Sequence, residues 1–317
     1  MKLVFCGTPE FAVPTLGAVL EAGHEVALVV TQPDRAAGRG METQIPAVKR
    51  LADERGLAVM QPERIKNNEE FRRRLEEIRP DAIAVVAYGR MIPEWMLSLP
   101  RFGNINLHGS LLPKYRGAAP VQWAVANGEA VTGVTTMRLD AGLDTGDMLL
   151  ARAAPIGEEM GSPEVFDVLA EVGAKLMVET LAGLEAGTIV PVAQDHSQAT
   201  MAPILTREDG LVDFRRGARA IYDRWRGFYP WPGAHTLFRG RKLIFHGLGM
   251  GATEGVEGGA ESTREGELMV QGEELVVVCG GLSVLRISEL QVEGKRRMAA
   301  AEFVRGYRVA PGERLGA

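Results

Sequence analysis

Residues 1–11 read MKLVFCGTPEF, and this stretch decides the fold of the first part of the chain. Four apolar residues before a glycine are typical of a short buried strand. Thr8, Pro9 and Glu10 then supply an N-cap, a proline at the first helical position and an early acid. We therefore predict a strand, a tight turn and a helix that ends at Gly23. The apolar run is too short for the core of a secretory signal.

The same alternation of short apolar runs and helical patterns continues over about two hundred residues, which is typical of parallel strands joined by crossover helices. It predicts an α/β fold with a doubly wound, mostly parallel, Rossmann-like sheet. Further strands are expected at residues 26–31, 82–87, 105–107 and 134–139, and helices at residues 46–55, 68–78, 120–127 and 163–186.

A length of 317 residues favours two domains. We expect a catalytic domain at residues 1–187, a polar linker at 188–205 and a smaller domain at 206–317. The smaller domain opens with a helix whose Ile221, Tyr222, Trp225 and Phe228 share an apolar face, with Arg215, Arg219 and Arg226 largely elsewhere. Short strands at 237–245, 266–270, 275–279 and 282–290 predict an OB-like β-barrel, with an exposed loop at 247–261.

Composition indicates a globular, cytoplasmic protein without a membrane partner, because 46% of residues are hydrophobic, 24% are charged and no apolar run reaches 18 residues. The two cysteines, Cys6 and Cys279, have no metal-ligand spacing, so we expect no disulfide and no metal. Net charge is -5, but from Thr206 onward 17 Lys and Arg face 15 Asp and Glu. This mildly basic second part permits RNA binding without demanding it.

The first turn also argues against a nucleotide cofactor. Residues 5–11 lack the G-x-G-x-x-G pattern that lets a pyrophosphate approach the backbone, and no Walker A lysine follows. A nucleotide-dependent oxidoreductase, which the sheet pattern alone would suggest, therefore loses its support.

Candidate chemistry begins at residues 104–117, NINLHGSLLPKYRG. Side chains alternate along a strand, so Asn106 and His108 point to one side, about 6 to 7 Å apart. An amide donor beside an imidazole suits a carbonyl that becomes an oxyanion. Ligands of such sheets bind at the carboxyl ends of strands, where Gly109 ends this one. The alternative is that Asn106 caps a turn and His108 is a satisfied buried histidine.

A second polar segment, residues 140–147, reads DAGLDTGD and follows a predicted strand. Its spacing does not fit a calcium loop. A carboxylate from this glycine-rich turn could orient His108 and help to move a proton. Alternatively the three acids cap turns, and we keep that interpretation for Asp147.

Together the two segments resemble the 10-formyltetrahydrofolate-dependent formyltransferases, whose hallmarks are N-x-H followed by S-L-L-P, and G-L-D-T-G-D. The resemblance implies 10-formyltetrahydrofolate as formyl donor, without metal or nucleotide cofactor. It further implies that Asn106 and His108 stabilise the formyl group and that Asp144 supports proton transfer. By the same resemblance the folate site includes Ser110, Leu111, Leu112, Pro113, Tyr88, Gly89 and Met91.

Within this family the whole chain is most similar to the branch that formylates the α-amine of methionyl initiator tRNA. Residues 116–122, RGAAPVQ, carry that likeness, as do 228–233, FYPWPG, in the second domain. Residues 31–40, TQPDRAAGRG, resemble the family's tRNA-facing loop, in which Arg39 matches an arginine that reaches the acceptor end. Where some relatives continue with lysines, this chain has Met41-Glu42-Thr43.

Other tRNA contacts are expected at Lys295 and Arg296 of the second domain, although these residues, like Arg35 and Arg39, could be a solvated surface. We expect a monomer. The implied reaction is direct attack of the amine on the formyl carbon, with no nucleophile from Cys6 or Ser110. Three alternatives remain: a formylfolate hydrolase, a sugar-amine formyltransferase, and an RNA-binding protein with a vestigial folate site.

Overall fold

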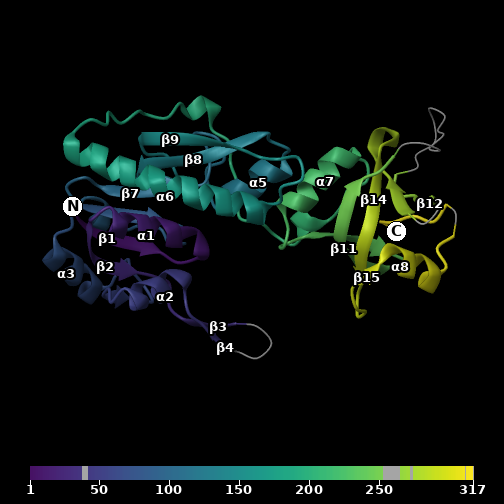
Figure 1. Cartoon of the computed structure of the whole chain (residues 1–317), viewed down its shortest axis with the longest axis horizontal. Coiled ribbons are helices and arrows are strands. Elements are labelled where there is room, and N and C mark those ends of the chain that lie inside the picture. Colours follow the sequence, from purple (N-terminus) through teal and green to yellow (C-terminus); the bar gives the residue numbers. More distant parts are fainter. Residues whose placement is uncertain (38–41, 253–264, 272–273, 311, 317) are drawn as a thin grey trace. The chain divides into compact units, whose positions relative to one another are not determined.

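The computed structural model describes the chain except residues 38–41, 253–264, 272–273, 311 and 317, and it divides into two compact units (Figure 1). Unit 1 comprises Met1–Pro120, Val131–Ile156 and Glu164–Pro203; unit 2 comprises Val121–Ala130, Gly157–Pro163 and Ile204–Ala317. Within the described ranges, no helix combines the length and the apolar character that crossing a bilayer requires.

Unit 1 is built on a seven-stranded sheet of order β5-β2-β1-β6-β7-β8-β9. Five strands pair in parallel: β1 (Lys2–Gly7), β2 (Glu25–Val30), β5 (Val59–Met60), β6 (Ala82–Val86) and β7 (Asn104–His108). Two more, β8 (Val131–Arg138) and β9 (Met148–Pro155), add to β7 as an antiparallel edge. The predicted mostly parallel α/β sheet is confirmed. The strand β9, at residues 148–155, is not among the strands predicted from the sequence.

The helices of this unit are α1 (Val13–Glu21), α2 (Ala47–Glu54), α3 (Glu69–Ile78), α4 (Glu94–Leu97) and α6 (Ser162–Ala186), which begins in unit 2. A short hairpin of β3 (Arg35–Ala37) and β4 (Glu42–Gln44) lies between β2 and α2. The helix predicted from Thr8 onward starts instead as a 3-10 turn, Glu10–Ala12, because the Thr8 hydroxyl donates to the carbonyl of Tyr88 at 3.3 Å and caps nothing.

The central parallel strands β1 and β6 are buried on both faces, which explains their near-continuous apolar sequences. On one face Val4, Leu28 and Ile83 pack with Phe71 and Leu75 of α3. Side chains alternate, so Leu107 points to the other face, where it meets α6: a Cβ on Gly173 would stand 2.5 Å from Leu107. Helix α3 begins at a capping residue: the Asn68 side chain accepts from the N–H of Phe71 at 2.9 Å and caps the first turn.

Unit 2 contains α5 (Pro120–Ala126, from Val121 on), α7 (Ala218–Gly227), α8 (Ala300–Tyr307) and an antiparallel sheet of order β10-β11-β14-β13-β12. Its strands are β10 (Ala234–Phe238), β11 (Arg241–Met250), β12 (Leu268–Gln271), β13 (Glu274–Val278), β14 (Val284–Val292) and β15 (Met298–Ala299), which pairs with β14. Short 3-10 segments also occur at Glu10–Ala12, His196–Gln198, Glu208–Gly210 and Gly280–Leu282.

The end of the chain joins the two edges of this sheet. The N–H of Leu268 donates to the carbonyl of Glu313 at 2.7 Å, and the N–H of Leu315 donates to Gly266 at 2.7 Å. On the opposite edge, the N–H of Gly316 donates to the carbonyl of Leu237 at 2.8 Å. The C-terminal segment therefore satisfies backbone groups on both edge strands, as a barrel requires.

Two sequence predictions in unit 2 are wrong in detail. The single strand expected at 237–245 is a hairpin, because Arg239 and Gly240 both adopt positive φ, 50° and 69°, and reverse the chain between β10 and β11. The exposed loop expected at 247–261 starts too early, since β11 runs to Met250 and pairs with β14. Residues 253–261 of that loop lie outside the described residues.

The arginines of α7 do not share one solvated face. Arg226 is 3% exposed, and its Nε donates to Asp223 at 2.7 Å while its Nη1 donates to the carbonyls of Gly157 and Met160. Arg219, half exposed, donates to the other Asp223 oxygen at 2.9 Å. Asp223 therefore neutralises a buried guanidinium that belongs to the core of unit 2.

We expect Asp223→Ala to lower the free energy of unfolding by about 3–5 kcal/mol, because it leaves Arg226 buried without a counter-charge. Arg219→Gln is the control and should cost no more than about 1 kcal/mol, since the Arg219 side chain is half exposed and Arg226 still pairs with Asp223. Urea unfolding followed by circular dichroism measures both. Equal losses for the two variants would contradict the central role of the Asp223–Arg226 pair.

Candidate active site

The end of β7 presents two polar side chains on one face of the sheet. The parallel register sets Asn106 beside Val85 of β6, and the antiparallel register sets His108 beside Thr135 of β8. Asn106 is partly exposed, and among the described residues its amide makes no hydrogen bond. Nearby Asn104 is different, because its amide donates to the carbonyl of Met96 at 2.8 Å. Asn106 thus has an uncommitted donor, whereas Asn104 holds α4.

His108 is 6% exposed, and each of its ring nitrogens faces an oxygen of another residue. Its Nε2 lies 2.8 Å from the carbonyl oxygen of Tyr115, and a carbonyl can only accept, so Nε2 carries a proton. Nδ1 lies 3.7 Å from Oδ2 of Asp144. The imidazole is thereby oriented, and its protonated form would face a carboxylate. The predicted pair of His108 and Asp144 is thus brought together.

Asp144 reaches this position because the loop after β8, which carries it, runs back along β7. Because β8 is antiparallel, its end returns to the start of β7, where the N–H of Leu139 donates to the carbonyl of Asn104 at 2.8 Å. Asp144 then adopts a positive φ of 52°, and its Oδ2 accepts from the N–H of Gly117 at 2.8 Å. The first acid of the segment, Asp140, caps its own turn by accepting from the N–H of Gly142 at 3.0 Å.

Sequence reasoning missed Gln194 and Arg116, which fix the Asp144 loop. The Gln194 amide donates to the carbonyls of Asp144 and Gly146 at 2.9 and 2.7 Å. Its oxygen accepts two bonds from the buried Arg116 guanidinium, at 3.1 and 2.6 Å. Gln194 falls within the predicted linker, and residues of that stretch up to Pro203 group with unit 1. No local sequence pattern indicates that Gln194 has this role.

Residues 110–113 form a tight turn after β7. The Ser110 hydroxyl is fully buried and donates to the carbonyl of Lys114 at 2.6 Å. Thr135 on β8 bridges the turn, since its hydroxyl donates to the Ser110 carbonyl at 2.7 Å and accepts from the N–H of Leu112 at 3.1 Å. The Leu112–Pro113 peptide bond is cis. Ser110 therefore shapes the turn, and only its neighbours Leu111 and Pro113 keep partly exposed side chains.

The other part of the expected folate site, Tyr88, Gly89 and Met91, also divides into buried and exposed residues. Tyr88 is 2% exposed and belongs to the core under α3, and its burial raises the pKa of its hydroxyl. Only its backbone can serve a ligand, and its carbonyl already accepts from Gln32 at 3.1 Å. Gly89 has a φ of 77°, and Met91 is 74% exposed. Met91 is thus the side chain of this loop that is free to contact a ligand.

A large cleft of about 1270 Å³ lies in unit 1 at the carboxyl ends of β1, β2 and β6. The loops after these strands supply Thr8, Gln32 and Arg90, and the β3–β4 hairpin supplies Arg35 and Thr43. Arg39, predicted to contact tRNA, falls between β3 and β4 and lies outside the described residues.

The remaining candidates lie elsewhere. In unit 2 Lys295 and Arg296 are exposed; Arg296 donates to Glu302 at 2.5 Å, whereas Lys295 forms no ion pair within the described part of the chain. Cys6 is fully buried in β1, and burial raises the pKa of its thiol, so it is not poised as a nucleophile.

On an α/β sheet, an amide, an imidazole and a carboxylate close to the end of one strand are groups that suit acyl transfer. The protein-family model described as formyl transferase matches residues 1–181, and that of the formyl transferase C-terminal domain matches residues 204–308. The chain belongs to the formyl transferase family.

Full-length relatives define the branch of that family. Methionyl-tRNA formyltransferases of Acidobacterium capsulatum, Koribacter versatilis and Solibacter usitatus are 62%, 56% and 51% identical to it. Each alignment covers all of this chain and 99–100% of the relative. The interpretation as a methionyl-tRNA formyltransferase is thereby confirmed over the hydrolase and sugar-amine alternatives.

Solved structures share the fold at low identity. An N-formyltransferase from Helicobacter canadensis, in complex with folinic acid and dTDP-3-aminofucose, aligns with a TM-score of 0.64 at 16% identity over 90% of this chain and 98% of that one. HypX from Aquifex aeolicus, in complex with tetrahydrofolic acid, aligns at 0.63 and 17% over 96% of this chain. This chain spans about half the length of HypX, 48%.

We expect Gly117→Ala to damage the site through the backbone. Gly117 has a φ of 116°, and a Cβ there would stand 2.7 Å from the carbonyl oxygen of Ala202. The strain should destabilise the protein by about 1–3 kcal/mol and shift the N–H that holds Asp144. Thermal unfolding with an activity assay measures both effects.

Gly17→Ala is the matched control. Gly17 lies on helix α1, and a Cβ added there would meet no atom within 4 Å. This variant should raise the free energy of unfolding by about 0.5–1 kcal/mol and leave activity unchanged. Equal stability of the two variants would refute the proposed strain.

Proposed function

We propose that this chain transfers the formyl group of 10-formyltetrahydrofolate to the α-amine of methionyl initiator tRNA, producing N-formylmethionyl-tRNA for translation initiation. The observation that carries the proposal is the uncommitted Asn106 amide on the same strand face as His108, whose Nδ1 stands 3.7 Å from Asp144. Relatives that match the whole chain and carry the name methionyl-tRNA formyltransferase support the substrate.

In the proposed mechanism the neutral amine attacks the formyl carbon on N10 of the folate. A new C–N bond forms, and the carbonyl oxygen becomes an oxyanion that the Asn106 amide stabilises by a hydrogen bond and protonated His108 stabilises by its positive charge. The C–N10 bond then breaks, and the proton lost by the amine reaches N10 directly or through Asp144 and water. Asp144 acts on His108 by facing Nδ1, while the Tyr115 carbonyl holds Nε2.

A folate donor is supported by the solved structures of the same fold that hold tetrahydrofolic acid or folinic acid. In this chain we assign the donor site to the turn of Ser110, Leu111, Leu112 and Pro113 and to Tyr88, Gly89 and Met91. Leu111, Pro113 and Met91 would contact the ligand with side chains, because they are the exposed members of these loops. Ser110 and Tyr88 would contribute backbone shape.

For the tRNA we assign the acceptor end to the Arg39 loop and the cleft that its hairpin borders. Arg35, Arg50 and Arg90 line that cleft and suit phosphate groups, although Glu10 pairs with Arg50. Lys295 offers a free charge in unit 2, whereas Arg296 must leave Glu302 to contact RNA. We further propose that the protein acts as a monomer in the cytoplasm.

The Asp144→Asn variant should distinguish a role of Asp144 in turnover from a role in folate binding. The amide keeps an oxygen that can accept from the N–H of Gly117, but it removes the negative charge beside His108. We expect turnover to fall by about 10²-fold or more, with folate affinity changed less than about threefold. Steady-state kinetics and folate titration measure the two effects. Equal losses in both would contradict the role given to Asp144.

The direct test of the proposed function is transfer of labelled formyl from 10-formyltetrahydrofolate to methionyl initiator tRNA. We expect wild type to form labelled formylmethionyl-tRNA, and Arg39→Ala to do so with a kcat/KM for tRNA lowered by about tenfold or more, as for one lost charged contact. Arg55→Ala, which removes a charge from the C-cap of α2, is the control. Release of formate without labelled tRNA would instead indicate a hydrolase.

A further inference from the structure

Several arginines of unit 2 that could contact RNA are already neutralised by a carboxylate. Arg215 binds Asp213, Arg239 binds Glu313, Arg286 binds Glu274, Arg296 binds Glu302 and Arg297 binds Glu289. A guanidinium that faces a carboxylate of its own chain attracts a phosphate weakly, because the local charges cancel. An anion site in this unit must therefore be sought among arginines without such a partner.

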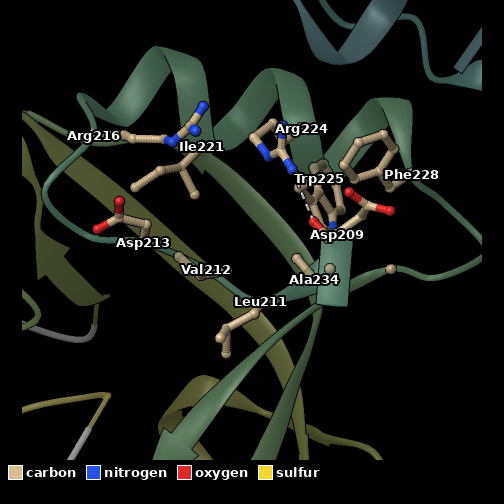
Figure 2. A pocket seen from close by; sticks show the side chains of 12 residues that line it. Asp209, Leu211, Val212, Asp213, Arg216, Ile221, Arg224, Trp225, Phe228 and Ala234 are labelled. Carbon is tan, nitrogen blue, oxygen red and sulfur yellow. Dashed lines mark hydrogen bonds between the residues drawn. The ribbon is translucent and has the colours of Figure 1, made fainter. Parts of the chain in front are cut away.

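Two arginines without a carboxylate partner in the described part of unit 2 border one cleft. Arg216, just before α7, is exposed and its guanidinium makes no hydrogen bond there; Arg224 lies on α7 (Figure 2). The cleft has a volume of about 70 Å³ and is also lined by Trp225 and Phe228. That is the room of roughly two water molecules, enough for the oxygens of one phosphate group and too small for a nucleobase.

Arg224 is held in place without being neutralised. Its guanidinium carbon lies 4.8 Å from the centre of the Phe228 ring and 5.6 Å from that of Trp123. One N–H donates to the backbone carbonyl of Asp209 at 3.0 Å, the bond drawn in Figure 2. Stacking fixes the plane of the guanidinium, so its remaining donors have little rotational freedom to lose on binding.

The positive charges at this cleft repel one another in the free protein. Burial lowers the pKa of Arg224, and the neighbouring charge of Arg216 lowers it further. An anion between the two guanidiniums would relieve that repulsion. The Trp225 indole N–H adds a buried donor without an acceptor among the described residues.

Two carboxylates, Asp209 and Asp213, also line the cleft; their hydrogen bonds go to other residues, although the charge of Asp213 still interacts with Arg216. Asp213 accepts two bonds from Arg215, at 2.8 and 3.0 Å. Asp209 accepts from the N–H and hydroxyl of Thr206 at 2.8 and 2.9 Å, although its charge still acts on Arg224. Neither forms an ion pair with Arg216 or Arg224, so the free donors of the cleft belong to the arginines.

We infer that the cleft between Arg216 and Arg224 binds one phosphodiester group of the substrate tRNA. This inference rests on the proposed function, which supplies a polyanionic substrate. Guanidinium forks bind phosphate oxygens in pairs, and such contacts position an RNA without reading its sequence. The cleft thus gives unit 2 a fixed point of contact with the tRNA backbone.

The test is the salt dependence of tRNA binding by the full-length protein. Each phosphate contact contributes about 0.7–0.9 to the slope of log affinity against log salt concentration. Arg216→Gln should lower that slope by about this amount and weaken binding about three- to tenfold at low salt. Arg216→Lys, which keeps the charge, should retain most of the slope.

Arg286→Gln is the control, because it removes the same charge from an exposed arginine of unit 2 that is paired with Glu274. It should leave the slope within about 0.2 of wild type. In kinetics, Arg216→Gln should raise KM for methionyl-tRNA while leaving kcat and KM for the formyl donor unchanged. Thermal unfolding checks that each variant is folded.

The outcomes separate the two proposals. If wild type formylates methionyl-tRNA and Arg216→Gln matches Arg286→Gln in slope and KM, the phosphate site is wrong and the proposed function stands. If wild type transfers no formyl group to the tRNA, the proposed function fails first. A loss of slope in Arg216→Gln alone supports the site.

Discussion

The hydrogen bond from the N–H of Gly117 to Asp144 is the constraint on which the geometry of the site depends. It ties the loop after β7 to the loop after β8, and Tyr115, two residues earlier, holds the other side of His108 through its carbonyl. Between them Arg116 reaches Gln194, which in turn holds the backbone of Asp144. The loops therefore fix each other before any ligand arrives, and stabilisation of a developing charge costs little reorganisation when donors are fixed in this way.

The antiparallel direction of β8 decides how the Asp144 loop reaches this site. Because β8 runs the other way, its loop starts beside Asn104 and must cross the face of β7 that carries Asn106 and His108. Positive φ at Asp144 lets the chain turn its carboxylate down toward the imidazole.

Much of this could be predicted from the sequence, because the informative signals are local. Alternation along β7 gave the common face of Asn106 and His108, and the helical pattern of residues 68–78 gave α3. The antiparallel direction of β8, the role of Gln194 and the partners of the arginines could not be predicted. Each depends on contacts between residues far apart in the chain, such as Arg226 with Gly157, for which no local pattern exists.

Charge counted along the sequence is for the same reason a poor guide to RNA binding by unit 2. The excess of two positive charges after Thr206 is small, yet the attraction that a phosphate feels depends on which donors remain free after folding. Asp223 forms ion pairs with two arginines, one of them buried, and Glu302 forms an ion pair with Arg296. Folding thus pairs several of the basic residues with carboxylates of the same chain. In a nearly neutral domain, the attraction for a phosphate then depends on the guanidiniums that find no such partner.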